Sequence, residues 1–346
     1  MTLQSIYKHI KEEIDECAKP LFFFDNDPDG LTSFLLLYRY KKEGHGVVIK
    51  TRPRITTEFV RKVNEYEPDK IFILDIAQVD QEFLDQVNVP VVWIDHHPVE
   101  RREKVLHLNP RLSGETPVPT SYMCYQAVRQ DLWIAMIGSI ADWYVPDFKD
   151  QFCEHYPGLA DPILKEPAEY LFTTKLGELI RIFSFNLKGS TTDALKSIKI
   201  MSRISSPEEI LEQQTGQGKF LYKKYERIEK DYQALKKVAI AQEKKTKKDP
   251  FLVFIYEEDN ISLTKDLSNE LLYLFPKKII VLGRRKSGEI KCSLRCSGTY
   301  KLNIALEKAL MGIQGYGGGH DYACGCCIKE EEFPSFLENF KKALDL

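Results

Sequence analysis

Residues 21–30 read Leu-Phe-Phe-Phe-Asp-Asn-Asp-Pro-Asp-Gly, an apolar run followed directly by three aspartates at alternate positions. Four apolar residues are typical of a buried strand and too few for a core helix. Asp25, Asp27 and Asp29 are so close in the chain that they raise one another's pKa, and a bound cation relieves that repulsion. The sequence therefore predicts a strand that ends in a cation-binding loop.

The opening of this loop also fits a calcium loop of the EF-hand type, which begins D-x-D-x-D-G. That loop needs a glutamate after five more residues and follows a helix. Here Leu36 occupies the glutamate position and a strand comes first. The calcium interpretation is therefore rejected.

The alternation of short apolar runs with amphipathic stretches continues through the first 145 residues. Apolar runs predict strands at 21–24, 47–50, 71–74 and 91–94, and helical spacing predicts helices at 32–42, 57–66 and 81–87. Strands that alternate with helices imply parallel pairing and a sheet covered on both faces. Two further helices are expected at 120–130 and 132–141, and Thr120 is the expected N-cap of the first.

Beyond residue 165 the strand pattern stops and later returns. Residues 165–248 read as helices, and the last of them, over 220–248, is a charged helix of the kind that bridges two bodies. We interpret the lysine pairs of this helix as part of a solvated face rather than as a site that contacts a phosphate backbone. Strands return at 251–256, 278–282 and 290–295, with helices near 266–275, 302–310 and 335–344.

These patterns predict an α/β protein in three parts. We expect an N-terminal parallel-sheet domain over residues 1–150, a helical linker region over 151–249 and a smaller C-terminal α/β domain over 250–346.

Composition excludes several classes of protein. The 346 residues carry 49 Lys and Arg against 51 Asp and Glu, so a partner that bears phosphates must be held by a local site. No apolar run approaches the roughly 18 residues that span a bilayer, and the charged amphipathic N-terminus does not resemble a signal peptide. The eight cysteines then read as reduced thiols. We expect a cytoplasmic protein without a membrane partner.

Three other acidic segments stand near the ends of apolar ones. Asp75 follows the run 71–74, Asp95-His96-His97 follows the run 91–94, and Asp142 lies near the end of an apolar helix. A lone aspartate at a strand end is more often a turn or cap residue. Ligands of an open parallel sheet, however, bind beyond the carboxyl ends of its strands, and several carboxylates with imidazoles suit a pair of divalent metals. We therefore interpret the acidic segments as one metal site.

These residues, in this order, resemble the motifs of the DHH phosphoesterase superfamily, which is named for its Asp-His-His motif. Asp25–Gly30 is similar to the first motif, Asp75 to the second, Asp95-His96-His97 to the third and Asp142 to the fourth. Near the C-terminus, Cys292-Ser293-Leu294-Arg295 and Gly317-Gly318-Gly319-His320 resemble the Ser-Leu-Arg and Gly-Gly-Gly-His signatures of the DHH-associated domain. The combination resembles the archaeal RecJ-type nucleases.

The resemblance implies two divalent cations, with Mn²⁺ as the first choice and Mg²⁺ or Co²⁺ as alternatives. Asp27 would bind one metal and Asp29 the other, while Asp75 would bridge both. The implied ligand set is Asp25, Asp27, Asp29, Asp75, His96 and Asp142. Phe23 stands where relatives such as inorganic pyrophosphatases carry a histidine, so Asp25 is the candidate replacement ligand.

The catalytic candidates are His97 and Asp95, with His97 beside the scissile phosphate. His97 either donates a proton to the leaving oxygen or orients the phosphate by hydrogen bonding. Two cations would supply an activated water, so no separate general base is expected.

The C-terminal domain carries the predicted substrate-binding residues. Arg295 offers a fork for a phosphate, His320 offers a further donor, and the run Gly317, Gly318 and Gly319 lets backbone N–H groups approach an anion as in a nest. By resemblance, this patch holds the terminal or the next nucleotide. Cysteines 292, 296, 324, 326 and 327 surround it, and their spacing favours packing thiols over a zinc site.

The leading functional hypothesis is a Mn²⁺-dependent exonuclease that releases nucleoside monophosphates from single-stranded DNA or RNA, with bases stacked on aromatics such as Trp143 or Tyr144. One alternative is a hydrolase of dinucleotides, cyclic dinucleotides or 3′-phosphoadenosine phosphate. Another is a non-catalytic replication scaffold, and the resemblance also allows association with a replisome component. Cleavage polarity, preference for DNA or RNA, oligomeric state and the physiological metal stay open.

Overall fold

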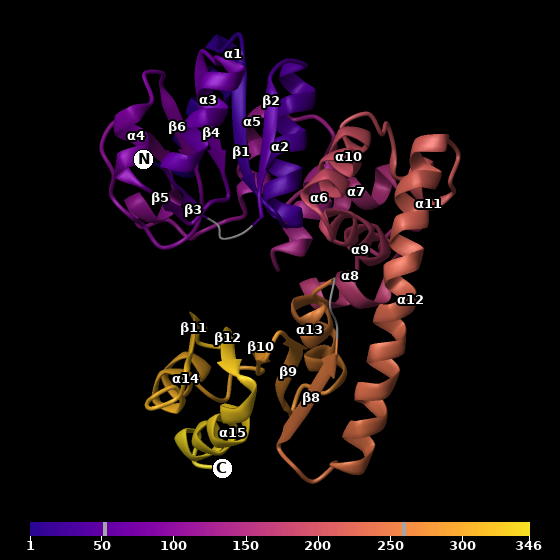
Figure 1. The fold of residues 1–346 in the computed structure, drawn as a ribbon. Helices are drawn as coiled ribbons and strands as arrows, with labels where there is room; N and C mark the ends of the chain where they lie inside the picture. Colours follow the sequence, from indigo (N-terminus) through magenta and orange to yellow (C-terminus); the bar gives the residue numbers. More distant parts are fainter. Residues whose placement is uncertain (51–53, 258–260) are drawn as a thin grey trace. The chain divides into compact units, whose positions relative to one another are not determined.

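The computed structural model describes residues 1–50, 54–257 and 261–346. They form two compact units, Met1–Tyr225 and Glu226–Leu346, and each unit has its own five-stranded sheet (Figure 1). The predicted α/β class and the N-terminal parallel sheet are confirmed. The domain boundaries near residues 150 and 249 stay a prediction. In the described part of the chain, no helix is both long and apolar enough to cross a membrane.

The sheet of the first unit is parallel throughout. Its order is β2-β1-β4-β6-β7, formed by β1 (Pro20–Asp25), β2 (His45–Ile49), β4 (Lys70–Leu74), β6 (Val91–Ile94) and β7 (Leu106–Leu108). A separate two-stranded parallel sheet pairs β3 (Arg54–Ile55) with β5 (Gln78–Val79). The four predicted strands lie where the apolar runs placed them, whereas β7, β3 and β5 were not predicted.

Helices cover both faces of this sheet, so the side chains that alternate along β1 are buried on both sides. Phe22 and Phe24 pack on Phe34 of α2, while Phe23 packs on Phe59 and Phe83. One face therefore carries α2 (Pro28–Lys41), on which α5 (Thr120–Val128) and α6 (Leu132–Ala141) pack, with α1 (Leu3–Glu16) against α5. The other face carries η1 (Thr57–Phe59), α3 (Val60–Tyr66) and α4 (Gln81–Gln86).

The strand order places a switch point beside β1. From β1 the chain forms β2 on one side and then crosses back to form β4 on the other side. Loops diverge where the order reverses, so a parallel sheet is open to ligands beyond the carboxyl ends of the strands at that point. Those ends carry Asp25 and Asp75.

The middle of the chain is helical, as predicted. It contains α7 (Lys149–His155), α8 (Pro167–Thr173), α9 (Lys175–Leu187), α10 (Thr191–Met201), α11 (Pro207–Leu211) and α12 (Gly216–Lys245). The short η2 (Pro110–Ser113) comes earlier, between β7 and α5. Buried residues recur every three or four positions from Gly218 to Tyr232 and again at Ala239 and Glu243, which leaves the opposite side of this charged helix solvated. The boundary between the two units falls inside α12.

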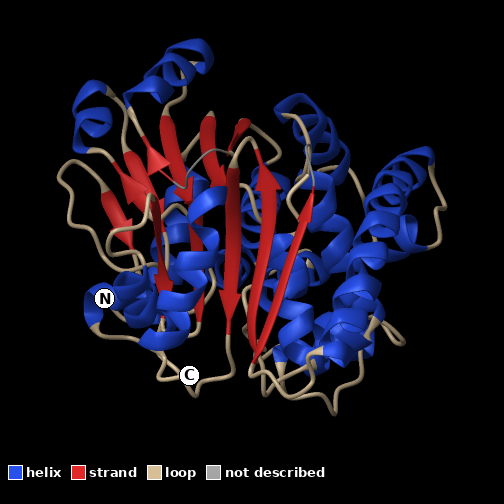
Figure 2. Cartoon of the chain, turned by 60° about the horizontal axis from the view of Figure 1, so that its bottom comes forward, coloured by secondary structure: helices blue, strands red, loops and turns tan. Residues whose placement is uncertain are grey.

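The sheet of the second unit is mixed (Figure 2). Its order is β11-β12-β10-β9-β8, and only the pair β8–β9 is parallel. The strands are β8 (Phe251–Glu257), β9 (Ile279–Lys286), β10 (Glu289–Arg295), β11 (Gly315–His320) and β12 (Ala323–Lys329). The helical segments are α13 (Thr264–Leu274), α14 (Leu302–Ala309), η3 (Glu330–Glu332) and α15 (Phe333–Ala343).

The glycine run that we expected to act as a nest is the edge strand β11. Gly317 pairs with Cys326 and Gly319 pairs with Cys324, so the run is extended and antiparallel to β12. A nest needs successive residues of alternating handedness, whereas only Gly319 in this run has a positive φ. As the edge strand of the sheet, β11 still presents one row of backbone groups outward.

Candidate metal centre

The carboxyl ends of three neighbouring strands carry predicted acidic residues. Asp25 is the last residue of β1, Asp75 follows β4 directly, and Asp95 follows β6 directly. Because β4 lies between β1 and β6 in a parallel sheet, the three residues emerge at one edge.

The turn from β1 into α2 places two further aspartates beside Asp25. Asp27 is the N-cap of α2, and its Oδ1 accepts a hydrogen bond of 3.1 Å from the Gly30 N–H. Asp29 lies in the first turn, since α2 begins at Pro28 rather than at the predicted residue 32. A Cβ on Gly30 would lie 2.7 Å from the Asp25 backbone, so only glycine permits this tight turn.

The N-terminus of α5 holds the Asp29 carboxylate. The Thr120 N–H donates to Asp29 Oδ2 at 2.9 Å, while the N–H and hydroxyl of Ser121 both donate to Oδ1, the former at 3.0 Å. Helix N-termini carry unpaired N–H groups and a partial positive charge, which suits this contact. The predicted N-cap at Thr120 is wrong: Pro119 is the N-cap, and Thr120 turns its N–H toward Asp29.

Asp29 is nevertheless hard to ionise. Burial raises its pKa to about 7, and repulsion by Asp27 adds to that shift, although the hydrogen bonds from Ser121 and Thr120 oppose it. A carboxylate in this position gains from a positive charge that replaces its proton.

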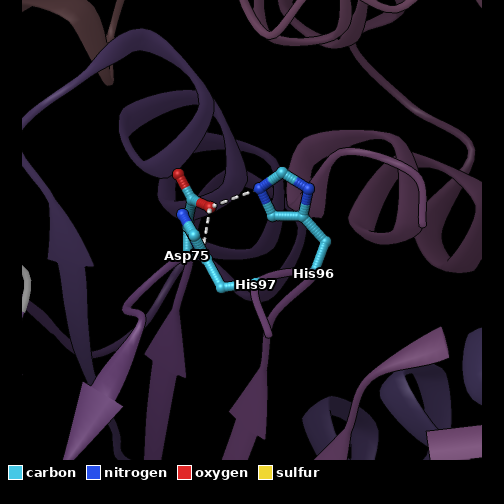
Figure 3. A group of neighbouring side chains, drawn as sticks. All are labelled: Asp75, His96 and His97. Atoms are coloured by element: carbon cyan, nitrogen blue, oxygen red, sulfur yellow. Dashed lines mark ion pairs between the residues drawn. The ribbon is translucent and has the colours of Figure 1, made fainter. Parts of the chain in front are cut away.

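Asp75 lies at the middle of the centre. Its backbone is left-handed, with φ 57°, and its N–H donates to the Ile94 carbonyl at 3.0 Å. Its Oδ1 lies 3.3 Å from His96 Nε2 and 3.9 Å from His97 Nδ1, and Figure 3 marks both ion pairs with dashed lines that meet at this one oxygen. Burial, followed by repulsion from Asp29 and Asp27, raises the pKa of Asp75 well above its usual value.

His96 lies between two carboxylates. Its Nε2 faces Asp75, and its Nδ1 lies 3.7 Å from Asp142 Oδ2. Its carbonyl accepts a hydrogen bond of 2.8 Å from Arg111 Nε, which fixes the loop. Burial lowers the pKa of His96 to about 4, with a smaller contribution from His97. The imidazole is therefore neutral at pH 7, which is the form that binds metals.

His97 is tied to Asp95 instead. Its Nδ1 lies 2.7 Å from Asp95 Oδ1, and its backbone N–H donates to Oδ2 at 3.0 Å. Burial alone lowers the pKa of His97, but the hydrogen bond and charge of Asp95 outweigh it and raise the pKa. The side chain of His97 stays 31% exposed while Asp95 is fully buried, so only His97 is accessible to a bound molecule.

The fourth motif comes from the end of α6. Asp142 is the C-cap, and its N–H donates to the Gly138 carbonyl at 3.0 Å. Trp143 follows in a left-handed conformation, with φ 59°, and is 45% exposed. This turn leaves Asp142 beside His96.

Ligand atoms of the predicted metal set gather in three overlapping groups, each with its atoms within 4.8 Å of one another. The groups are Asp25 with Asp27 and Asp75; Asp29 with His96 and Asp142; and Asp75 with His96 and His97. Asp75 is common to the first and the third, and His96 to the second and the third. The structure thus brings together all six predicted metal ligands and His97.

Phe23 takes no part in these groups. It is fully buried in the core on the η1 and α4 side of the sheet, against Phe59 and Phe83. Asp25, two residues later in the same strand, takes part in the first group.

Three residues that support the centre were not assigned to it from the sequence. Thr120 and Ser121 bind Asp29, while Asn109 donates to Asp95 Oδ2 at 3.2 Å and to the His97 carbonyl at 3.0 Å. All three are buried. Polar residues next to a predicted helix start are common, and nothing in their spacing marks them as partners of distant aspartates.

The predicted substrate-binding residues lie in the second unit, around the end of β10 and along β11. Arg295 donates from Nε to Asn269 Oδ1 at 2.7 Å and from Nη1 to the carbonyls of Leu294 and Cys324. Burial lowers the pKa of Arg295 to about 10. These contacts fix its guanidinium and leave Nη2 without a hydrogen bond among the described residues, while His320, at the end of β11, is exposed.

The cysteines near this patch are buried free thiols. Four of them, at positions 292, 296, 324 and 326, belong to the apolar core under β10 and β12. The Cys326 neighbour and burial raise the pKa of the Cys292 thiol, which disfavours the thiolate that binds metals.

Two family models match the chain. The DHH family N-terminal domain matches residues 21–142, and the DHHA1 domain matches residues 264–345, so together they cover more than half of the sequence. A search of curated protein sequences gave no match.

Solved RecJ structures share the fold. RecJ from Thermus thermophilus in complex with Mn²⁺ is 16% identical with a TM-score of 0.68, and the match covers 99% of this chain and 55% of that one. Its complex with Mg²⁺ gives 16% identity, a TM-score of 0.59, and coverage of 99% and 52%. This chain therefore spans about half the length of the Thermus protein.

A structure of exonuclease RecJ bound to manganese is closer in length. It is 15% identical with a TM-score of 0.62, and the match covers 100% of this chain and 94% of that one. At such identities the matches show a common fold. With the two domain models matched in order along one sequence, the chain belongs to the DHH superfamily and has its phosphoesterase fold in a RecJ-like form.

Proposed function

We propose that this chain is a two-metal phosphodiesterase, and that it acts as an exonuclease on single-stranded DNA or RNA. The observation that carries the proposal is the set of three overlapping ligand groups around Asp75. Two of them, Asp25 with Asp27 and Asp75, and Asp29 with His96 and Asp142, supply three ligand atoms each. In the proposed division each set holds one cation, and Asp75 contributes to both.

The donor set fits divalent metals of the Mn²⁺ and Mg²⁺ class. Five carboxylates and a neutral imidazole match the preferences of Mn²⁺, and the solved RecJ structures contain Mn²⁺ or Mg²⁺. The raised pKa values of Asp29 and Asp75 point the same way, because two buried carboxyl groups without a cation retain protons. When bound, the two cations would activate a water and neutralise charge that develops on the phosphate.

His97 is the group we assign to the leaving oxygen. Its Nδ1 is engaged with Asp95, so its Nε2 is the atom available to a substrate, and the raised pKa favours the protonated ring. We propose that Nε2 donates a proton to the leaving oxygen. Asp95 acts through His97 as a positioning residue, because it is fully buried and both of its oxygens accept hydrogen bonds.

The preference for single strands rests on exposed stacking surface beside the centre. Trp143 directly follows Asp142 and is 45% exposed, which suits stacking on an unpaired base. The patch at Arg295 and His320 would hold a phosphate of the same strand. Nucleoside monophosphates are the expected product.

The experiment is release of label from end-labelled single strands in the presence of Mn²⁺. We expect the native chain to release mononucleotides, Asp75→Asn to lose release by several orders of magnitude, and Asp85→Asn to match the native chain. Asp85 is a surface aspartate paired with Lys104, and it serves as the matched control.

Two results would contradict this proposal. One is an inactive native chain, and the other is undiminished release by Asp75→Asn. Hydrolysis confined to dinucleotides or cyclic dinucleotides would instead assign the small-molecule activity.

A further inference from the structure

One face of the sheet in the second unit has an unexpected arrangement around β11. Opposite residues of an antiparallel pair share a face, so Tyr316, Gly318 and His320 of β11 lie on the same face as Cys327, Gly325 and Ala323 of β12. The next strand continues each row with Lys291, Ser293 and Arg295 of β10. Three parallel rows therefore cross the strands. The predicted side-chain donors to phosphate, Arg295 and His320, occupy only the third.

The middle row has glycine at two positions where the surrounding structure would accept a side chain. A Cβ on Gly318 would meet nothing within 4 Å, and a Cβ on Gly325 would meet only the Cys292 carbonyl, at 3.6 Å. Neither glycine has a positive φ. Glycine weakens a strand and often marks a close approach by another molecule, so these two positions leave room for something outside the sheet.

The other glycines of the run have structural reasons. A Cβ on Gly317 would lie 2.7 Å from Cys326 Cβ and 3.1 Å from Leu306 of α14, on the opposite face. Gly319 has φ 146°, and its Cβ would overlap the Ala323 carbonyl. Of the three consecutive glycines, only Gly318 is unexplained by packing.

The first row carries an aromatic ring and two cations. Tyr316 is 62% exposed, and its hydroxyl interacts with the Cys327 thiol. Lys291 lies in the same row on β10, and Arg284 of β9 pairs with it. Among the described residues, the Nε of Arg284 is shielded from solvent and has no hydrogen-bond partner.

The surrounding charges leave this face positive. The end of the strands next to the Tyr316 row carries Lys286, Glu289 and Lys329. The Lys329 Nζ lies 3.3 Å from Glu289 Oε1 and neutralises this carboxylate. At the far end stand Arg295 and, near it, Asp266 of α13. The face thus suits a chain of phosphates.

Tyr316 and His320 are four residues apart, which is about 13 Å at the rise of a β-strand. One phosphate does not span that distance, so the first and third rows serve different nucleotides. We propose that Tyr316, Lys291 and Arg284 form a further nucleotide subsite, which holds a different nucleotide of the strand from the one at Arg295 and His320. The base stacks on Tyr316, and the phosphate lies against Lys291 and Arg284 with its backbone over Gly318 and Gly325.

This inference rests on the proposed nuclease function and names its substrate as strands longer than two nucleotides. A dinucleotide has a single phosphodiester and cannot supply phosphates to both the Arg295 row and the Tyr316 row, whereas an eight-nucleotide strand can. The native chain should therefore have a higher kcat/KM for the longer strand.

The test compares kcat/KM on two- and eight-nucleotide strands in Mn²⁺, and affinity for a fluorescent eight-nucleotide strand in EDTA. We expect Tyr316→Ala to lower that affinity about tenfold, and to reduce the length preference by a similar factor. Tyr316→Phe keeps the ring and should restore most of the affinity. Gly318→Leu should weaken binding as well, while its free energy of unfolding stays close to that of the native chain.

The salt dependence of the affinity tests the basic side chains separately. For a single strand, each phosphate contact contributes about −0.7 to the slope of log affinity against log salt concentration, so Lys291→Ala should flatten the slope by about that amount. Lys308→Ala is the matched control, because Lys308 is exposed on α14 at the opposite face of the sheet.

Unchanged affinity and unchanged length preference in Tyr316→Ala and Gly318→Leu would overturn the subsite and leave the nuclease intact. An inactive native chain would remove the proposed function, whereas the binding measurements in EDTA would still decide the subsite. A native chain that binds the eight-nucleotide strand no more tightly than the dinucleotide also overturns it.

Discussion

Among single residues, the centre combines two buried carboxyl groups that resist ionisation with a histidine that resists protonation. Burial raises the pKa of Asp29 to about 7 and lowers the pKa of His96 to about 4. Both shifts arise because burial removes the water that solvates a charge. A bound divalent cation favours the ionised form of the carboxyl groups, and it binds only the neutral form of the imidazole. Both groups therefore favour binding of a metal at neutral pH.

The first prediction concerns stability of the metal-free protein. A carboxyl group whose pKa is higher in the folded chain binds its proton more tightly there, so its stabilisation is complete below pH 4 and is lost as pH rises toward 7. For Asp29 alone the loss is about 4 kcal/mol at most. We expect the free energy of unfolding in EDTA to fall over this range, and Mn²⁺ to restore it at pH 7.

Asp75→Asn is the matching variant, since it removes one buried carboxyl group and one source of repulsion on Asp29. Its unfolding in EDTA should depend less on pH than that of the native chain. Equal pH dependence of the two proteins, measured by denaturant unfolding, would refute the assignment of these acids.

The second prediction concerns the proton on His97. Asp95 raises the pKa of His97, so a catalytic step that uses the protonated ring declines when pH exceeds that raised value. Asp95→Asn should move this decline in kcat to lower pH, and His97→Ala should lower kcat about 10²- to 10⁴-fold. If Asp95→Asn changes only the stability and leaves the pH profile in place, His97 does not donate the proton.

At the scale of elements, the centre depends on the close packing of α2, α5 and α6. Gly138 of α6 faces the hydroxyl groups of Thr32 in α2 and Ser121 in α5, and a Cβ there would overlap both. Ser121 in turn holds Asp29. The spacing between these helices therefore sets the position of a proposed metal ligand.

The third prediction is that Gly138→Ala disturbs both the packing and the metal ligand. We expect it to lower the free energy of unfolding by about 1–3 kcal/mol through overpacking, and to weaken Mn²⁺ binding in calorimetric titration because Ser121 is displaced. Gly216→Ala is the control, since a Cβ at this helix start meets nothing within 4 Å. Unimpaired Mn²⁺ affinity in Gly138→Ala would show that the packing does not position Asp29.

The strands also differ in whether the sequence alone predicts them. Strands β1, β4 and β6 are buried on both faces, so each appears as a continuous apolar run. Strand β11 has no such signal, because it is mostly glycine and each of its residues is exposed, and its pairing with β12 alone makes it a strand.

For the centre itself, the sequence was informative where chemistry and topology coincide. Aspartates and histidines directly after apolar strands are expected at one edge of a parallel sheet, and the structure gathers them there. The supporting roles of Asn109, Thr120 and Ser121 could not be predicted, because their contacts with Asp95 and Asp29 depend on the folding of distant segments.

For the whole molecule, the proposed ions connect segments that are distant in the sequence. The ligand groups draw on the end of β1, the start of α2, the loops after β4 and β6, and the end of α6, all within Met1–Tyr225. Bound cations therefore stabilise these segments together, whereas the described residues of the second unit contribute no ligand to the groups.

The fourth prediction follows from that connection. Addition of Mn²⁺ should slow amide hydrogen exchange in segments 25–31, 75–76, 95–97 and 120–122, because ion binding opposes local opening. Peptides from 279–295 and 315–329 should keep their exchange rates and serve as the internal control. Mass spectrometry of the full chain measures both, and equal protection of both units would contradict a centre confined to the first.

The number and spacing of Mn²⁺ ions, measured on the full chain by electron paramagnetic resonance titration, tests the central claim most directly. We predict two ions per chain at saturation with the spin coupling of a pair about 3.5–4 Å apart. Asp75→Asn should abolish the coupled signal. A single uncoupled ion in the native chain, or a coupled pair that survives in Asp75→Asn, would contradict the account.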